Sequence, residues 1–498
     1  MIDSGRRNSN DIELFSGVDW WTVILYVILT IIGFVAVFSA TYVEDSANFF
    51  SFKHMYVKHI FWLGISYTVG LVILLLDRSS WHKFAYYICA ATIFFVLLTF
   101  IPGLGKTVNG ARAWLGFGSF TLQPMELAKA GISLAVARMM SVYGFTVNRG
   151  NDLVKVMAIL AIPMGIAVLQ NDTGSGLVFC SFLFMLVREG LNYWICIPLV
   201  FLVALLILSF LLTPGVLLIS LILIFTFCAG MLMRNRWKAC IKYIVSLFFC
   251  SSILFLVLGI ILGKDFNYYE CLLYTTTASL LVVAVYAYRA NIRSIYLLIL
   301  FFFVSIICLP TSDMVFRHLK PHQQDRIRTF LGLVDDKDLL YNVNQSKIAI
   351  GSGGFAGKGF LKGSMIRYNR VPEKHTDFIF CTIGEEFGFI GAAILFTCLA
   401  LLILRLMRLG DRQLETFGRV YCYCVASILL FHCCINIGMT MGIVPVMGIP
   451  LPFISYGGSS LLGFTILVFI AIALDASPTK HQSTLRRWYN IAHKKCRE

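Results

Sequence analysis

Long apolar runs separated by short polar segments dominate the chain. A hydrocarbon core about 30 Å thick needs roughly 20 apolar residues per helix, and runs of that length recur along almost the whole sequence. The pattern predicts an all-α polytopic integral membrane protein with about fourteen transmembrane helices. We place them at residues 22–43, 60–76, 84–101, 124–141, 153–169, 174–187, 192–212, 214–233, 241–263, 270–289, 294–310, 384–405, 418–441 and 459–475.

Composition supports the same class. Of 498 residues, 58% are hydrophobic and only 13% are charged, which is typical of a chain solvated by lipid. Most of the 15 cysteines fall inside apolar runs. There they act as small buried hydrophobes, and the sequence has no CxxC metal pattern.

The net charge of +15 is distributed over short loops and the two ends of the chain. Because positively charged loops stay in the cytoplasm, this distribution predicts a multi-pass protein with both termini cytoplasmic, and it argues against a nucleic-acid partner. By alternation the loop at 311–378 then lies outside, although it carries eleven Lys and Arg against seven Asp and Glu. This loop is either a soluble, solvated segment or a folded basic cap that binds anionic lipid or phosphorylated substrate.

Residues 110–130 contain the first candidate for chemistry. Pro124 suits the first turn of a helix, and Glu126 and Lys129 follow at i and i+3, so that they share one helix face. Charges inside a membrane span are costly and usually meet a partner or a wet cavity. Either the two side chains form an ion pair that only stabilises the helix, or Lys129 faces a polar cavity and Glu126 tunes it.

Two further motifs fall at the outer ends of predicted spans. The turn NDTGSG at 171–176 has glycines that allow close helix approach, and Asp172 is a candidate N-cap. The segment GIVPVMGIPLPFISYGGSS at 442–460 interrupts an apolar region with three prolines and four glycines. We predict a kinked or re-entrant segment, because irregular backbone at membrane depth must be satisfied by protein or by a watery cavity.

The fourth motif, EKHTDFIF at 373–380, places Asp377 where polar sequence meets a long apolar run. One interpretation is that Thr376 or Asp377 caps the next helix. The other is that Asp377 is a general base at the mouth of a cavity, with cations nearby. Glu385 and Glu386 follow closely and leave further polar content unexplained.

At these residues the chain resembles the SEDS family of bacterial cell-wall polymerases, which includes RodA and FtsW. The resemblance rests on QPMELAK, NDTGSG, QSKIAIGSGGFAGKG, HTDFIFCTIGEEFGFIG and GIPLPFISYGGSS, in the family's order. GKGFLKGS and VPEKHTDFIF resemble RodA more than FtsW. The family implies a glycosyltransferase that polymerises lipid II into the nascent glycan strand during cell elongation, at the outer face of the bacterial cytoplasmic (inner) membrane. Its expected partner is a class B penicillin-binding protein within the elongation machinery.

The resemblance assigns the essential aspartate to Asp377 and the cavity residues to Glu126 and Lys129. Asp377 would accept the proton of the acceptor hydroxyl, and cations would stabilise the departing diphosphate. No cofactor is certain, although a divalent cation, Mg²⁺ or Mn²⁺, bridging the diphosphate is compatible with the chemistry. The remaining candidate substrate contacts are Arg112, Gln345, Lys347, Lys358, Lys374, His375 and Ser455.

The family usually has about ten spans, so we expect an insertion of about four helices. The expected organisation is a cytoplasmic N-terminus (1–21), an N-terminal transmembrane half (22–188), inserted helices (189–293), a transmembrane helix (294–310), the large outer loop (311–378), C-terminal helices (379–475) and a basic cytoplasmic tail (476–498). Two other functions fit many of the same features. One is a lipid II flippase or other transporter, and the second is a non-catalytic scaffold for cell-wall enzymes.

Overall fold

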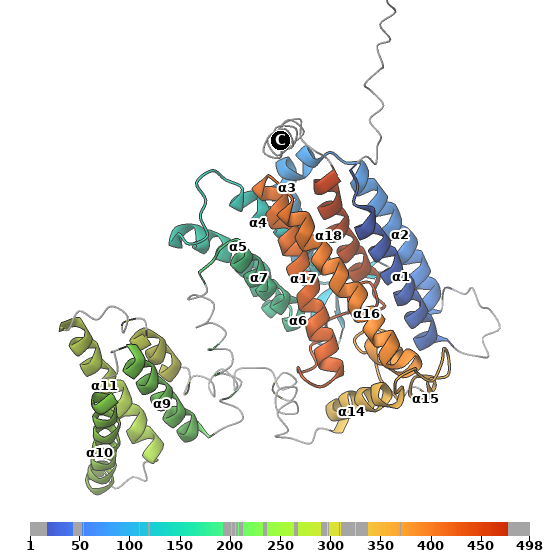
Figure 1. Ribbon diagram of the computed structural model, residues 1–498. Helices are drawn as coiled ribbons and strands as arrows, with labels where there is room; N and C mark the ends of the chain where they lie inside the picture. Colours follow the sequence, from blue (N-terminus) through green and yellow to red (C-terminus); the bar gives the residue numbers. More distant parts are fainter. Residues whose placement is uncertain are drawn as a thin grey trace, which may run out of the picture. The chain divides into compact units, whose positions relative to one another are not determined.

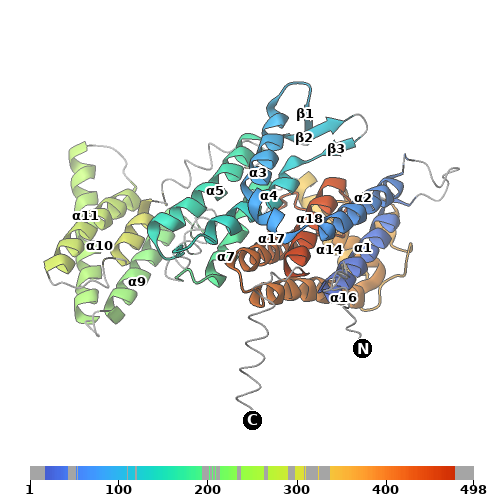
Figure 2. The same ribbon diagram turned by 90° about the horizontal axis from the view of Figure 1, so that it is seen from above.

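A computed structural model describes residues 17–42, 54–108, 110–117, 120–192, 213–232, 237–262, 267–289, 298–307, 337–368 and 370–476, together with positions 52, 201, 205, 208, 296, 309 and 324. The chain divides into two units, Met1–Leu191 with Lys337–Glu498, and Asn192–Asp336. Figure 1 and Figure 2 show the elements of each unit. The all-α membrane class is confirmed, and ten of the described helices are long and apolar enough to cross a membrane.

The first unit holds most of the helices. Its membrane-length helices are α1 (Trp20–Thr41), α2 (Met55–Leu75), α3 (Arg78–Leu97), α5 (Gly150–Leu169), α16 (Ile379–Asp411), α17 (Thr416–Thr440) and α18 (Gly458–Ala476). Shorter helices are α4 (Pro124–Met140), α6 (Thr173–Leu177), α7 (Phe182–Arg188), α14 (Lys337–Ser352) and α15 (Ser364–Arg367). Single 3₁₀ turns, η1 (Leu98–Phe100) and η2 (Val178–Ser181), follow α3 and α6.

Three helices form the centre of this unit. Most residues of α4, α17 and α18 are buried, whereas α2 and α3 leave most of their apolar side chains exposed. The central helices also pack on one another and are bordered by α2, α3 and α16. This arrangement explains the apolar surface of the outer helices, which lipid would cover.

Helix α16 is broken near its start. Gly388 has φ +60°, and a Cβ at this position would lie 2.4 Å from the backbone N of Gly357. The backbone N–H groups of Phe389 and Ile390 donate to the carbonyls of Gly354 and Phe355. The break therefore receives the loop 353–359, which lies between α14 and α15.

A small antiparallel sheet was not predicted. Strands β1 (Gly105–Val108), β2 (Ala111–Phe117) and β3 (Phe120–Leu122) form it in the order β1-β2-β3. Leu115 lies at the middle of the register, opposite Gly105 on one side and Leu122 on the other. The sheet leads directly into α4.

The second unit contains α9 (Pro214–Leu232), α10 (Trp237–Leu262) and α11 (Tyr268–Arg289). Its own core includes Leu218, Leu247 and Leu272, and also Phe302 and Ile306 from the short apolar helix at 298–307. The structure therefore groups this helix with the inserted ones, whereas the sequence placed 294–310 outside the insertion. The predicted span at 192–212 lies mostly outside the described residues.

Several boundaries differ from the prediction. Helices α2 and α3 begin at Met55 and Arg78 rather than at 60 and 84. Their opening turns carry polar residues such as His59 and His82, which an apolar pattern leaves out. The predicted spans at 124–141 and 174–187 correspond to α4 and to residues 173–188, both shorter than a typical span.

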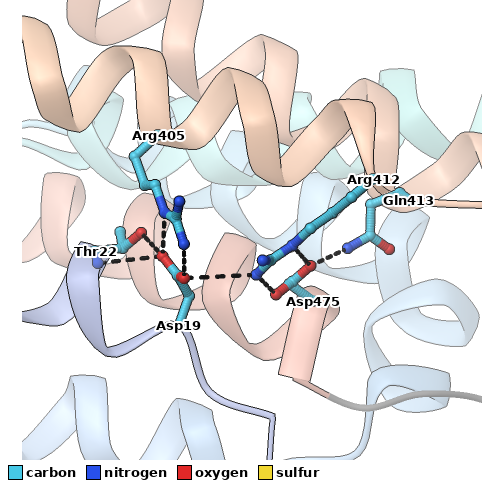
Figure 3. A network of polar contacts seen from close by, with 6 residues as sticks. All are labelled: Asp19, Thr22, Arg405, Arg412, Gln413 and Asp475. Atoms are coloured by element: carbon cyan, nitrogen blue, oxygen red, sulfur yellow. Dashed lines mark hydrogen bonds and ion pairs between the residues drawn. The ribbon is translucent and has the colours of Figure 1, made fainter.

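Charged side chains pair with one another where α16 ends. Asp19, at the N-cap of α1, contacts Arg405 and Arg412 of the α16 region, and Arg412 also contacts Asp475 at the end of α18 (Figure 3). Gln413 donates to Asp475 over 2.9 Å. The first and last described helices are therefore fixed to the same end of the unit.

Candidate active site around Asp377

Asp377 lies in a turn directly before α16 and is half-buried. Phe378 occupies the N-cap position of α16, and no side chain caps this helix. The interpretation of Thr376 or Asp377 as the N-cap is therefore wrong. The Asp377 carboxylate lies beside the irregular segment 442–457, since a Cβ on Gly448 would be 3.6 Å from its Oδ2.

Neutral side chains fix the backbone on which this carboxylate stands. Asn436 of α17 is fully buried and donates to the carbonyl of Asp377 (2.9 Å) and to that of Ile449 (2.7 Å). Ser455 donates to the carbonyl of Thr376 over 2.7 Å and accepts from the backbone N–H of Leu451. Two elements distant in sequence thus hold the peptides on either side of Asp377.

The segment 442–457 behaves as predicted from its glycines and prolines. It is irregular, yet Ile449, Leu451, Phe453 and Ser455 are buried. Side chains of the protein bind several of its backbone groups, namely the carbonyls of Ile449 and Pro450 and the N–H of Leu451, as buried irregular backbone requires. A plain external loop is excluded by this burial.

Glu385 fastens the cap, the described part of the loop 311–378, to α16. Its carboxylate is fully buried and accepts from Lys358 Nζ (2.6 Å) and from the backbone N–H groups of Met365 (2.9 Å) and Ile366 (3.1 Å). The carbonyl of Ile366 in turn accepts from Lys374. A chain of contacts therefore runs from Glu385 of α16 through Ile366 of the cap to Lys374, three residues before Asp377.

The described part of the cap is folded. Met365, Ile366 and Val371 form a small core with Phe378 and with Ala349 of α14. Ser346 of α14 donates to the carbonyl of Thr440. The prediction of a folded cap is confirmed for residues 337–368 and 370–378.

Glu126 and Lys129 form the ion pair that their spacing predicted. Lys129 Nζ donates to Glu126 Oε1 over 2.7 Å and to His432 Nε2 over 2.9 Å, and both members of the pair are buried. Because His432 Nδ1 faces the carbonyl of Pro450 at 3.1 Å, its Nε2 is the acceptor. The pair is thus enclosed and linked to segment 442–457.

The NDTGSG turn joins the same region. Asp172 caps α6 through the backbone N–H of Ser175 and accepts from Gln123, which precedes α4. A Cβ on Gly174 would lie 2.5 Å from the carbonyl oxygen of Met447, so this glycine permits close approach of segment 442–457. The four sequence motifs therefore gather at one end of the unit.

The other predicted contacts occupy varied positions. Lys347 of α14 is exposed, and Gln345 and Arg112 are half-buried. None of these three side chains makes a hydrogen bond or ion pair within the described part of the chain. The carbonyl of His375 accepts from the backbone N–H of Tyr456. Burial lowers the pKa of His375, and burial likewise lowers the pKa of Lys374 despite nearby carboxylates.

Sequence reasoning missed Asn436 and His432. Both are buried polar residues inside an apolar span, and that cost is itself a signal of function. Their spacing of one helical turn on α17 places them on the same face. Among the described residues, no three His, Cys, Asp or Glu side chains gather to hold a metal, so a divalent cation remains a proposal.

Comparison with known proteins agrees with this geometry. The family model described as "Cell cycle protein", FTSW_RODA_SPOVE, matches residues 19–218 and 218–480. Peptidoglycan glycosyltransferase RodA of Treponema pallidum is 30% identical, over 93% of this chain and 98% of the relative. Peptidoglycan glycosyltransferase MrdB of Escherichia coli is 29% identical, over 81% and 82%.

Solved structures share the fold. A chain in the structure titled "Structural coordination of polymerization and crosslinking by a peptidoglycan synthase complex" aligns with TM-score 0.58 and 22% identity, covering 92% of this chain and 97% of that one. The rod shape determining protein RodA of Thermus thermophilus aligns with TM-score 0.52 and 20% identity, covering 92% and 96%. With the family model matching nearly the whole sequence, the chain belongs to the FtsW/RodA/SpoVE family of membrane proteins.

Proposed function

We infer that this chain is a peptidoglycan glycosyltransferase that polymerises lipid II into glycan strands during cell elongation. Family membership and the activity named for its relatives support this. The tail of lipid II lies in lipid and its sugars lie in water, so the reaction belongs at a membrane boundary. Asp377 is directly before a membrane-length helix, which suits that boundary.

In this proposal Asp377 is the general base. It accepts the proton of the acceptor hydroxyl while the hydroxyl oxygen bonds to the anomeric carbon of the donor. The bond from that carbon to the lipid-linked diphosphate breaks at the same time, which inverts the anomeric configuration. A base of this kind contributes about a hundredfold to ten-thousandfold in rate.

One observation carries the assignment. Asn436 and Ser455 hold the carbonyls of Asp377 and Thr376, so the carboxylate stands on backbone fixed from two sides. Catalytic groups need such support, because small displacements from a productive geometry cost large factors in rate.

The departing diphosphate requires positive charge. Lys129 and Lys358 are each paired with a buried carboxylate, so we propose that they support the fold of the site. Arg112, Lys347 and Lys374 make no ion pair with a described residue and are the better candidates for the diphosphate. Gln345, His375 and Glu126 remain proposed substrate-side residues, and Mg²⁺ or Mn²⁺ a proposed bridging ion.

The proposed setting is the outer face of a bacterial cytoplasmic membrane, with both termini in the cytoplasm. A class B penicillin-binding protein is the proposed partner within the elongation machinery. The structural relative from a peptidoglycan synthase complex supports a partner of this kind. Membrane lipids surround the exposed apolar helices.

Polymerisation of labelled lipid II by the purified full chain tests the proposal. Wild-type protein is expected to form glycan strands, and Asp377→Ala is expected to form none, with and without the transpeptidase partner. Glu373→Gln removes an exposed carboxylate four residues away and should retain activity. Lipid II transport by wild type without any polymer would favour the flippase, and unchanged polymer with Asp377→Ala would remove the base.

A further inference from the structure

A polar cavity lies where α16 ends, at the opposite end of this helix from Asp377. Its volume is about 500 Å³, and its walls include the first residues of α3 and α17. The continuous part of α16 after the break at Gly388 runs to Asp411, and at a rise of about 1.5 Å per residue it alone spans roughly 35 Å. The catalytic proposal gives this cavity no role.

Two helix N-termini meet at the cavity. Arg78 and Ser79 begin α3, and Thr416 and Phe417 begin α17. The first backbone N–H groups of a helix have no partner within the helix, and the helix dipole makes this end positive. Neither α3 nor α17 has a side-chain cap. Two long helices thus direct donors toward one volume, which favours an anion.

A buried guanidinium gives independent evidence. Arg78 lines the cavity and is only 5% exposed, and its Nη1 has no hydrogen-bond partner among the described residues. Its Nη2 donates to Glu415 over 2.7 Å. A buried donor without a partner is costly. Because Nη1 has almost no accessible surface, an acceptor from the cavity would reach it only after a covering side chain moves.

Glu415 is the obvious competitor for that acceptor role. Its side chain is 46% exposed, in contrast to the buried guanidinium that it covers. Because the Glu415 carboxylate is half-exposed, it can turn away from Arg78 into solvent at little free-energy cost, which would expose the Arg78 guanidinium to the cavity. The ion pair is therefore compatible with exchange of one anion for another.

The remaining walls suit a tetrahedral anion. His82 lines the cavity and accepts a hydrogen bond from Arg138, so that a second guanidinium lies one residue behind this wall. Hydroxyl groups of Ser79, Ser141 and Thr416 complete the polar lining. Guanidinium groups, hydroxyls and helix N-termini are the groups that proteins use to bind phosphate.

We propose that this cavity binds a phosphate group, carried by a lipid head group or free in solution, which displaces Glu415 from Arg78. The position suits a head group, because α3 and α17 begin there as candidate membrane spans. Phosphates of lipid head groups lie at such span ends. The volume also exceeds what one phosphate needs and leaves space for attached groups.

The test uses the full chain in detergent and two probes, short-chain phosphatidylglycerol and inorganic phosphate. Binding of each probe is measured as the rise in the unfolding temperature of the protein with increasing probe concentration. Arg78→Gln is expected to weaken binding at least about tenfold because charge-assisted hydrogen bonds are lost. Glu415→Gln is expected to strengthen it, since the competing carboxylate is gone. Arg188→Gln, which breaks an exposed ion pair with Asp411 outside the cavity, should leave binding unchanged.

The two substitutions are expected to change the affinity for phosphate in opposite directions, so Glu415→Gln decides the outcome even where Arg78→Gln folds poorly. Tighter binding by Glu415→Gln supports the site, and the probe that responds identifies the source of the phosphate. Binding that is equal in wild type, Glu415→Gln and Arg188→Gln would overturn the proposal. So would the absence of binding of either probe to wild type and to Glu415→Gln.

Discussion

The two ends of α16 use polar residues differently. Before its first residue, the neutral side chains of Asn436 and Ser455 donate to the backbone carbonyls of Asp377 and Thr376. Near its last residue, charged side chains bind one another, as Asp19 does with Arg405 and Arg412. The hydrogen bonds at the first end position the irregular backbone around Asp377 and Ile449. The ion pairs at the second end join the ends of α1, α16 and α18.

This difference suggests a division of roles. Hydrogen bonds from neutral groups to backbone fix geometry without changing local charge, which suits a site where charge must develop during reaction. Mutually neutralised charges leave little field for a substrate, and removing one partner of such a pair leaves an uncompensated charge that destabilises the fold. Substitutions at one end should therefore change rate, and substitutions at the other should change stability.

Asn436→Ala offers the strongest test of positioning. The variant loses both hydrogen bonds that hold the carbonyls of Asp377 and Ile449. We expect kcat to fall about a hundredfold, because a displacement of about 1 Å can cost that much, with a smaller change in KM. Ser427→Ala, on the same helix but bonded only to the carbonyl of Tyr423, is the matched control. Equal effects of both variants would contradict the positioning role.

Glu385→Gln should have a smaller effect on rate. The substitution leaves Lys358 without its carboxylate and weakens the contacts to Met365 and Ile366. We expect activity to fall about tenfold, on the order of the loss of one charge-assisted hydrogen bond. Limited proteolysis between residues 354 and 367 should be faster. Ser364→Ala, which removes hydroxyl contacts with Lys358 (3.0 Å) and Glu385 (3.3 Å) but keeps the ion pair between them, serves as the control. Unchanged proteolysis would show that the cap does not depend on Glu385.

Asp19→Asn should leave the rate nearly unchanged and lower stability by about 2 kcal/mol, the scale of hydrogen bonds to charged groups. Burial raises the pKa of Asp19, but Arg405 and Thr22 outweigh it and hold the pKa at about 2. Since an unfolded Asp has a pKa of about 3.9, this stabilisation is complete above that pH and is lost as pH falls toward 2.

Thermal unfolding between about pH 6 and pH 3 tests this pH dependence. Over that interval wild type should lose more stability than Asp19→Asn. Parallel losses in the two proteins would mean that Asp19 contributes nothing through its charge. A large drop in the polymerisation rate of Asp19→Asn at neutral pH would contradict the assignment of rate to one end of α16 and stability to the other.

Much of this arrangement could be predicted from local sequence. The Glu126–Lys129 pair follows from helical spacing, and the buried character of 442–457 follows from its glycines and prolines in an apolar context. The small sheet at 105–122 escaped prediction because its strands are only three to seven residues long and carry little alternation.

The long-range contacts could not be derived. Asn436 and Asp377 are 59 residues apart, and only tertiary packing shows that the one supports the other. The role of Glu385 in fastening the cap depends in the same way on the break at Gly388. The Asp377 motif itself was recognised from sequence, but its supporting residues needed the structure.

The most direct test of the account compares the initial rates of glycan-strand formation by Asp377→Asn and Glu373→Gln at equal lipid II concentration. Both substitutions keep the size of the side chain and remove one negative charge from the same turn. The account predicts a loss of about a hundredfold to ten-thousandfold for Asp377→Asn, with unfolding temperature preserved, and a rate near wild type for Glu373→Gln. A wild-type rate for Asp377→Asn would contradict it.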